Sequence, residues 1–101
     1  MLVSISVTCK NKKEATKIAS ALLKKKLIAC ANIWPVGSIY WWQDKIQNTR
    51  EVMLVCKSLK KNVSKIEKEI ETLHSYEVPV IIVEVVNANK KCLDWIRAVI
   101  K

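Results

Sequence analysis

Glycine, proline and histidine are scarce in this chain of 101 residues. One glycine and two prolines are too few for a flexible linker, a low-complexity tract or a glycine-rich loop that cradles phosphates, so the usual kinds of nucleotide binding are disfavoured. The single histidine, His74, is the one centre for any chemistry that needs an imidazole as metal ligand or proton carrier.

The sequence also leads us to expect no metal module, membrane span or targeting leader. There is no Cys-x-x-Cys pair and no second histidine, which argues against a closed structural zinc site built by one chain. No window reaches 18 consecutive apolar residues, and the first eight residues lack a basic leader. We therefore expect a cytoplasmic protein that has no contact with a membrane and keeps all of its cysteines as free thiols. These are Cys9, Cys30, Cys56 and Cys92.

Arginine is rare although the chain is strongly basic. The formal net charge is +9, and 16 of the 18 basic residues are lysines. Base recognition in nucleic acids favours the bidentate contacts of arginine, so we do not expect a nucleic-acid partner. The lysine runs are typical of solvated helix ends, although they leave open a surface that binds an anion or a partner.

Hydrophobic periodicity predicts one domain over residues 1–101 with four strands and three helices. The expected strands are residues 2–9, 29–43, 51–57 and 80–86, and the expected helices are 14–27, 60–73 and 92–100. A bulge is expected near residues 34–37, where a proline and the glycine interrupt the second strand. The order βαββαβ indicates an α+β, ferredoxin-like fold: an antiparallel sheet of order 4-1-3-2, two helices on one face, and an appended C-terminal helix.

The segment from His74 to Pro79 is the strongest candidate for a functional site. Its plain structural interpretation is a connection from helix to strand, in which Pro79 stops the helix. In the predicted topology, however, the end of the first strand lies beside the start of the fourth, so Cys9 should meet this segment. A thiolate and an imidazole can bind copper or zinc, provided that a water, a carboxylate or a second subunit completes the ligand set.

Tyr40, Trp41 and Trp42 form an aromatic run in a strand whose side chains alternate between two faces. Each face therefore receives at least one large ring, and a single layer of helices covers only one face. The run is consistent either with core packing of one hairpin or with an interface between subunits, where aromatic anchors are enriched.

Several segments, read together and in order, resemble the divalent-cation-tolerance (CutA) family over essentially the whole chain. The segments are Cys9, Glu14-Ala15-Thr16, residues 27–33, Pro35, Ser38-Ile39-Tyr40, Trp42, Glu51 and residues 74–79. This resemblance implies a cytoplasmic homotrimer that binds copper or other divalent metal ions and catalyses no reaction.

The resemblance also implies which residues bind the metal. It places metal binding on Cys9 and His74, with Glu77 as a third candidate from its position. Val80 stands where the family often has an acid, which removes one further carboxylate ligand.

Two other function classes compete with metal binding. One is a hydrolase or transferase centred on His74 with Glu77 or Tyr76, although such enzymes need a nucleophile, a base and an orienting acid within mutual reach. The other is a trimeric scaffold that senses a small anion or holds a partner through its lysines. Salt dependence separates this scaffold from thiolate and imidazole ligation, since only charge-driven binding weakens steeply with salt.

Overall fold

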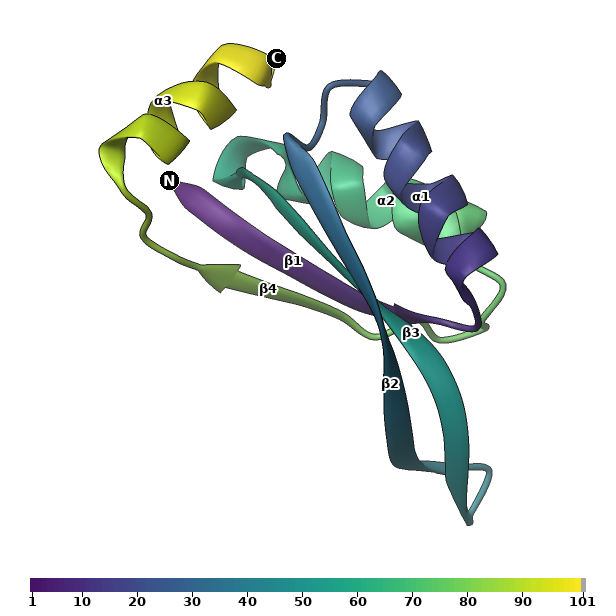
Figure 1. The fold of residues 1–101 in the computed structure, drawn as a ribbon. Helices are drawn as coiled ribbons and strands as arrows, with labels where there is room; N and C mark the ends of the chain where they lie inside the picture. The colour runs from purple at the N-terminus through teal and green to yellow at the C-terminus, as the bar shows by residue number, and fades with distance from the viewer. Residues whose placement is uncertain (101) are drawn as a thin grey trace.

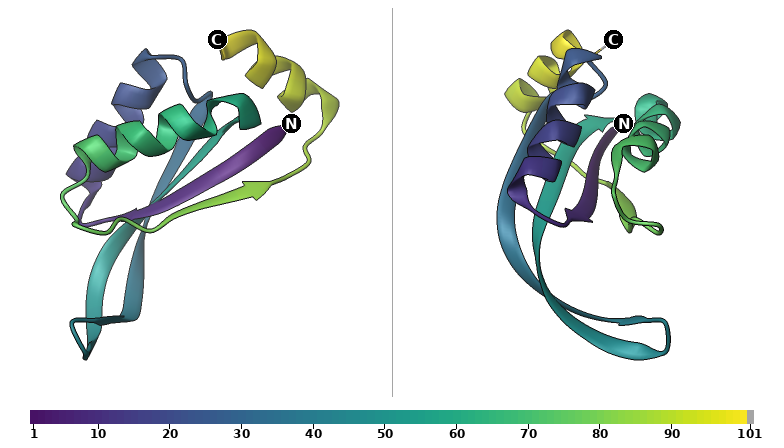
Figure 2. Two further views of the ribbon diagram at one scale, coloured as in Figure 1. Left: turned by 180° about the vertical axis from the view of Figure 1, so that it is seen from behind. Right: turned by 90° about the vertical axis from the view of Figure 1, so that its right-hand side faces the viewer.

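The computed structural model describes residues 1–100 and confirms the ferredoxin-like arrangement (Figure 1). The sheet order is β2-β3-β1-β4, which is 4-1-3-2 from the opposite edge, and each neighbouring pair is antiparallel. Helices α1 and α2 lie on one face of the sheet, while α3 follows β4 beside the N-terminal end of β1 (Figures 1 and 2). The elements are β1 Leu2–Cys9, α1 Lys12–Lys24, β2 Cys30–Trp42, β3 Lys45–Leu59, η1 Lys60–Asn62, α2 Val63–Leu73, β4 Ile81–Val85 and α3 Lys90–Val99.

Strand β1 is central in the sheet, and its alternating pattern builds the main core. The odd-numbered residues of β1 are buried against α1 and α2, because successive side chains of a strand point to opposite faces. Apolar residues of the two helices and of β3 complete this core. Its fully buried side chains include Val3, Ile5, Val7, Cys9, Ala15, Ile18, Leu22, Leu54, Cys56, Ile66 and Ile70.

Helix α1 begins directly after a capping residue, Asn11. The side chain of Asn11 accepts a hydrogen bond of 2.9 Å from the backbone N–H of Glu14, which satisfies one of the free donors of the first turn. The helix ends at Lys24, three residues before the predicted end, and Lys26 adopts a left-handed backbone conformation with φ of 55°. That conformation terminates the helix and directs the chain toward β2.

The β2–β3 hairpin differs from prediction in two ways. Its pairing runs without offset from Cys30 opposite Lys57 to Trp42 opposite Lys45, so the bulge expected near residues 34–37 is absent. Because β2 is the edge strand, a proline is tolerated there without interrupting the pairing. Strand β3 also begins six residues before the predicted start at Glu51, since residues 45–50 are mostly polar and pair only with β2.

The hairpin extends well beyond the rest of the sheet and curves (Figure 2). Its two-residue turn, Gln43 and Asp44, has positive φ at both positions, 50° and 63°. This is the geometry of a type I′ turn, whose twist matches that of the strands on either side. The molecule measures 44 × 24 × 21 Å and is therefore elongated along one axis.

The C-terminal helix α3 packs on a second, smaller core. Ile96 and Ile100 lie against Leu2 and Ala29, at the end of the sheet far from the hairpin turn. No helix among residues 1–100 combines the length and the apolar character that a bilayer span requires. The four cysteines are free, as the sequence predicts.

Candidate metal centre at the end of β1

Cys9, Glu14 and His74 come together where β1 ends, α1 begins and α2 ends. Cys9 is the last residue of β1, Glu14 lies in the first turn of α1, and His74 caps the C-terminal end of α2. All three residues are buried, and one thiol, carboxylate or imidazole ligand atom from each lies within 4.8 Å of the others. Sulfur, nitrogen and oxygen donors at this spacing form a group that can hold a metal ion.

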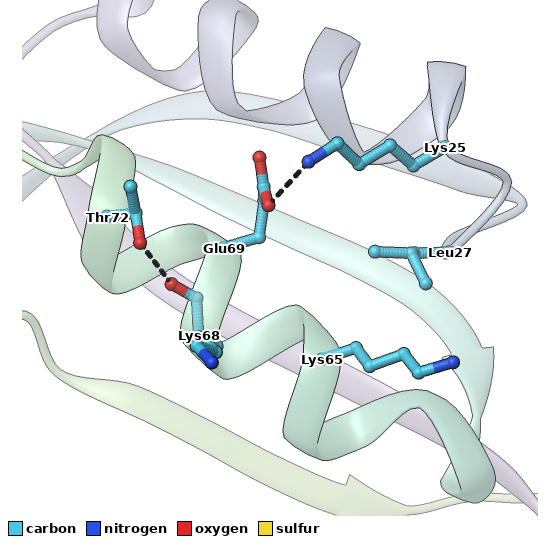
Figure 3. A pocket seen from close by; sticks show the side chains of 6 residues that line it. All are labelled: Lys25, Leu27, Lys65, Lys68, Glu69 and Thr72. Atoms are coloured by element: carbon cyan, nitrogen blue, oxygen red, sulfur yellow. Dashed lines mark hydrogen bonds and ion pairs between the residues drawn. The ribbon is translucent and has the colours of Figure 1, made fainter.

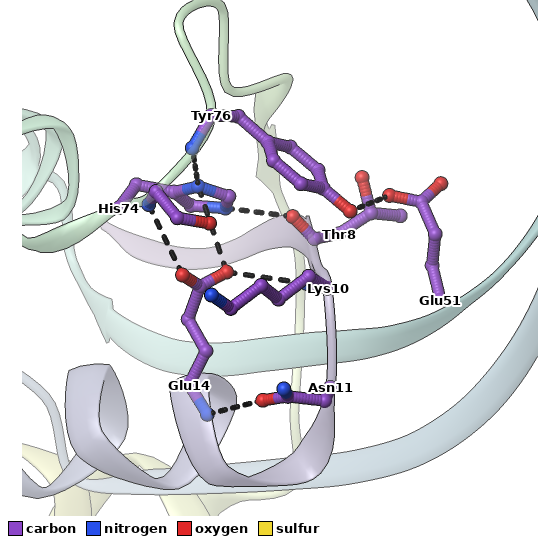
Figure 4. A network of polar contacts seen from close by, with 8 residues as sticks. Thr8, Lys10, Asn11, Glu14, Glu51, His74 and Tyr76 are labelled. Carbon is purple, nitrogen blue, oxygen red and sulfur yellow. Dashed lines mark hydrogen bonds and ion pairs between the residues drawn. The ribbon is translucent and has the colours of Figure 1, made fainter.

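Glu14 anchors this cluster through both carboxylate oxygens (Figure 4). Oε1 accepts a 3.1 Å hydrogen bond from the backbone N–H of Lys10, and Oε2 accepts one of 3.0 Å from the backbone N–H of Ser75. Oε1 also lies 3.7 Å from Nδ1 of His74. Burial alone would raise the pKa of Glu14, but the bonds from Ser75 and Lys10 and the nearby His74 lower it below its ordinary value. Glu14 is therefore a carboxylate at neutral pH.

Both ring nitrogens of His74 are already engaged. Nε2 lies 2.8 Å from the backbone carbonyl oxygen of Thr8, which can only accept, so Nε2 carries the proton. Nδ1 accepts a 3.0 Å hydrogen bond from the backbone N–H of Tyr76. The tautomer follows from these partners. A metal ion that used Nδ1 would have to displace the N–H of Tyr76, which couples metal binding to movement of the chain after α2.

Cys9 holds its proton firmly. Burial is the main cause that raises the pKa of this thiol to about 12, and the nearby carboxylates of Glu14 and Glu51 add to it. Because the thiolate is the form that binds metal, ligation by Cys9 must release a proton.

Tyr76 extends the network to a second buried carboxylate. Its hydroxyl donates a 2.6 Å hydrogen bond to Oε2 of Glu51, and its ring centroid lies 4.6 Å from that of His74 (Figure 4). Burial and the bond to Glu51 raise the pKa of Tyr76 above its ordinary value, so the hydroxyl stays a donor. Tyr76 thus links the cluster to Glu51 of β3.

The structure brings together some of the predicted site residues but not all. Cys9 and His74 are neighbours, whereas Glu77 is exposed and outside the cluster. The third ligand group of the cluster comes from Glu14, which the sequence analysis did not name as a ligand candidate. A signal for it was present, because Asn11 followed three residues later by Glu14 is the spacing of a helix capping box, which predicts that the acid is hydrogen-bonded at the start of the helix.

The aromatic run lies on the end of the hairpin. Tyr40, Trp41 and Trp42 are 39%, 71% and 38% exposed, so this chain alone does not bury them. They pair only with the first residues of β3. Their contacts therefore do not support a packed core within one chain.

Lysines line a shallow groove between α1 and α2 (Figure 3). Lys25 forms a 2.8 Å ion pair with Glu69, while Lys65 and Lys68 have no acidic partner among residues 1–100. Leu27 and Thr72 complete the lining. The lysines lie on the exposed surface of the helix layer, as the sequence predicts for solvated helix positions.

Comparison with known proteins identifies one family. The sequence profile described as CutA1 divalent ion tolerance protein matches residues 3–99. The divalent-cation tolerance protein CutA of Archaeoglobus fulgidus is 37% identical over 93 residues, which cover 91% of each protein. Protein CutA of Homo sapiens is 39% identical over 95 residues, which cover 92% of this chain and 53% of the human protein.

Solved structures agree with this result over the full chain. The structure of the periplasmic divalent cation tolerance protein CutA from Archaeoglobus fulgidus has a TM-score of 0.97 and 34% identity, with both chains covered completely. The divalent cation tolerance protein from Thermus thermophilus has a TM-score of 0.94 and 32% identity, again with both chains covered completely. The elongated hairpin therefore belongs to a fold that these proteins share.

Proposed function

The chain belongs to the CutA1 family of divalent ion tolerance proteins, and from this premise we propose that it binds copper or another divalent metal ion as a cytoplasmic homotrimer, without catalysis. The observation that carries the metal proposal is the buried group of Cys9, Glu14 and His74, with ligand atoms within 4.8 Å of one another. The four free thiols are compatible with a reducing compartment.

The donor chemistry favours soft and borderline ions. Thiolate and imidazole prefer copper and zinc, whereas magnesium and calcium prefer sites built from oxygen alone. Binding has two costs, the proton on Cys9 and the hydrogen bond that Tyr76 donates to His74. Protons compete for the ligands, so affinity should decrease as the pH falls.

A metal titration of the native protein tests this site. Zinc and copper are expected to bind, magnesium is not, and Cys9→Ala and His74→Ala should each weaken binding by at least about tenfold because each removes a ligand. Calorimetry at constant ionic strength measures the affinities. Zinc serves as the primary probe because copper(II) oxidises thiols.

Two glutamine variants identify the third ligand. Glu14→Gln is expected to weaken zinc binding, whereas Glu77→Gln, at an exposed acid outside the cluster, should leave it unchanged. Circular dichroism verifies that each variant is folded. Unchanged zinc binding in both Cys9→Ala and His74→Ala would contradict the proposed site.

The proposed trimer is supported by the apolar surface of the hairpin. Ile39, Trp41 and Ile46 are 73%, 71% and 63% exposed, and they lie on one extended ribbon. Apolar side chains gathered in this way are typical of surfaces that bind another protein. A second subunit could also pair with the free edge of β2 or β4.

Light scattering is expected to give three times the chain mass of 11.6 kDa at micromolar concentration. Trp41→Lys should lower this mass, because a charge placed in an apolar interface loses its hydration. Leu23→Lys is the matched control, since Leu23 is 41% exposed on α1 and is not part of the hairpin. A monomeric wild-type protein would refute the oligomer.

A further inference from the structure

The positive charge of the chain is concentrated on the layer of helices α1 and α2. Residues 10–26 and 60–73, which include both helices and η1, contain eleven lysines and four glutamates. They therefore carry a net charge of +7, out of +9 for the whole chain, and one of the four acids, Glu14, is buried. The proposed trimer uses the hairpin, which extends away from this layer (Figure 1), so the lysines stay accessible to another molecule.

Both helices of this layer begin with a pair of lysines. Lys12 and Lys13 are the first two residues of α1, while Lys60 and Lys61 lie in η1, directly before α2. The first turn of α2 contains no acid. Cations at the N-terminal end of a helix oppose the helix dipole and reduce the stability of the helix. The stability of the fold therefore does not explain these lysines, which points to a role in binding another molecule.

A groove of about 370 Å³ lies where lysines from both helices meet (Figure 3). Lys25 directly follows α1, whereas Lys65 and Lys68 belong to α2. The ion pair between Lys25 and Glu69 is on the surface, where such pairs contribute little to stability. Across residues 1–100, Lys65 and Lys68 have no acidic partner. A carboxylate that enters the groove therefore meets two unpaired ammonium groups beside the apolar side chain of Leu27.

The composition of the helix layer distinguishes between the partners that could cover it. A second copy of the layer would bring the same positive charge and be repelled. Residues 10–26 and 60–73 contain no arginine and no aromatic residue, so this layer lacks bidentate contacts to phosphate and stacking on bases. Leu23 is the one large hydrophobic side chain exposed in these two segments, which is too little apolar surface to insert into a bilayer. An acidic protein segment needs neither feature, because its carboxylates pair with lysines as point charges.

We propose that the lysine-lined groove between α1 and α2 docks a segment of a partner protein that is rich in aspartate or glutamate. Lys65 and Lys68 pair with carboxylates of that segment. The lysines at residues 24–26 and 60–61, which lie close to the groove residues in the chain, accelerate association through their combined charge. The proposal is independent of metal binding at Cys9 and of the trimer.

Fluorescence anisotropy of a labelled oligoglutamate peptide, titrated with the native protein, tests the proposal. Saturable binding is expected at low ionic strength with a Kd below about 1 mM, and it should weaken as salt is added because salt screens exposed charges. An oligoglutamine peptide of the same length is the neutral control and should not bind. If oligoglutamate shows no saturable binding below about 1 mM, the proposal is wrong.

Matched double variants show whether the binding uses this groove. Lys65→Glu with Lys68→Glu should weaken oligoglutamate binding by at least about tenfold, because two attractive charges become repulsive. Lys65→Arg with Lys68→Arg retains both charges and should bind like the wild type. Lys90→Glu with Lys91→Glu is the matched control, because it changes the net charge equally at exposed positions of α3 outside the groove. This control should change the affinity by less than about threefold.

Duplex DNA and vesicles that contain phosphatidylserine are the competing probes under the same conditions. Any binding to them should respond alike to the two glutamate double variants, because general attraction depends on net charge. If DNA or vesicle binding is lost only in Lys65→Glu with Lys68→Glu, the groove recognises a different partner and the proposal is wrong. Equal loss of oligoglutamate binding in both glutamate double variants would also overturn it. Circular dichroism and light scattering verify that each variant retains its fold and its oligomer.

Discussion

Above about pH 9 the protein is expected to lose stability steeply, because two buried thiols resist ionisation in the folded state. Burial raises the pKa of Cys9 and of Cys56 to about 12 each, from an ordinary value of 9.0. The folded state thus keeps protons that the unfolded state loses. The contribution of each thiol is full below about pH 9 and decreases as the pH rises toward 12, by about 1.4 kcal/mol per pH unit.

Urea denaturation at several alkaline pH values, at fixed protein concentration, measures this slope. Cys56→Ala should show a shallower decrease with pH than the wild type, even though the variant starts less stable from the lost packing. The comparison is between slopes, because contributions that both proteins share then cancel. Cys92→Ala, at a half-buried thiol outside the main core, should retain the wild-type slope. Parallel slopes for the wild type and Cys56→Ala would contradict the linkage.

Glu14→Ala is expected to reduce the free energy of unfolding by about 2–4 kcal/mol, because it leaves the backbone donors of Lys10 and Ser75 without their acceptor. Because the pKa of Glu14 is lowered in the folded state, its contribution to the free energy of unfolding depends on pH. Its contribution is present above the ordinary carboxyl pKa and is lost as the pH falls through the lowered folded value. The wild type should therefore lose more stability in acid than Glu14→Ala does.

The control for this prediction is Glu71→Ala, at an exposed acid of α2, which should change stability by less than about 0.5 kcal/mol. Thermal and urea denaturation between neutral and acidic pH measure both effects. If Glu71→Ala lost a similar amount of stability, the effect of Glu14→Ala would come from the change in net charge and not from the buried hydrogen bonds.

The cluster around His74 supports two interpretations at once. The hydrogen bonds to Thr8 and Tyr76 tie the end of α2 to β1, which is a structural role. The same imidazole, with Cys9 and Glu14, has the donor types and the spacing of a metal site. Metal binding at Nδ1 would replace the hydrogen bond from the backbone of Tyr76, whose hydroxyl also bonds Glu51.

Sequence periodicity was sufficient to predict most elements and the topology, because it reports which side chains are buried. The alternation of β1 and the amphipathic stripes of α1 and α2 led to the order 4-1-3-2. That order also brought Cys9 beside His74. The first six residues of β3 escaped prediction, since they have no core beneath them and hence no hydrophobic pattern.

Only the tertiary structure decided which acid lies beside His74 and which buried groups are ionised. Both depend on packing between elements, which the sequence does not show. The sequence analysis named Glu77 and missed Glu14, but the first turn of α1 buries Glu14 against His74, while the chain before β4 leaves Glu77 in solvent. Likewise, the hydrogen bond between Tyr76 and Glu51 joins residues 25 positions apart. These contacts join residues that are far apart in the sequence, and local periodicity does not encode them. The burial and the pKa shifts that depend on such contacts therefore could not be predicted.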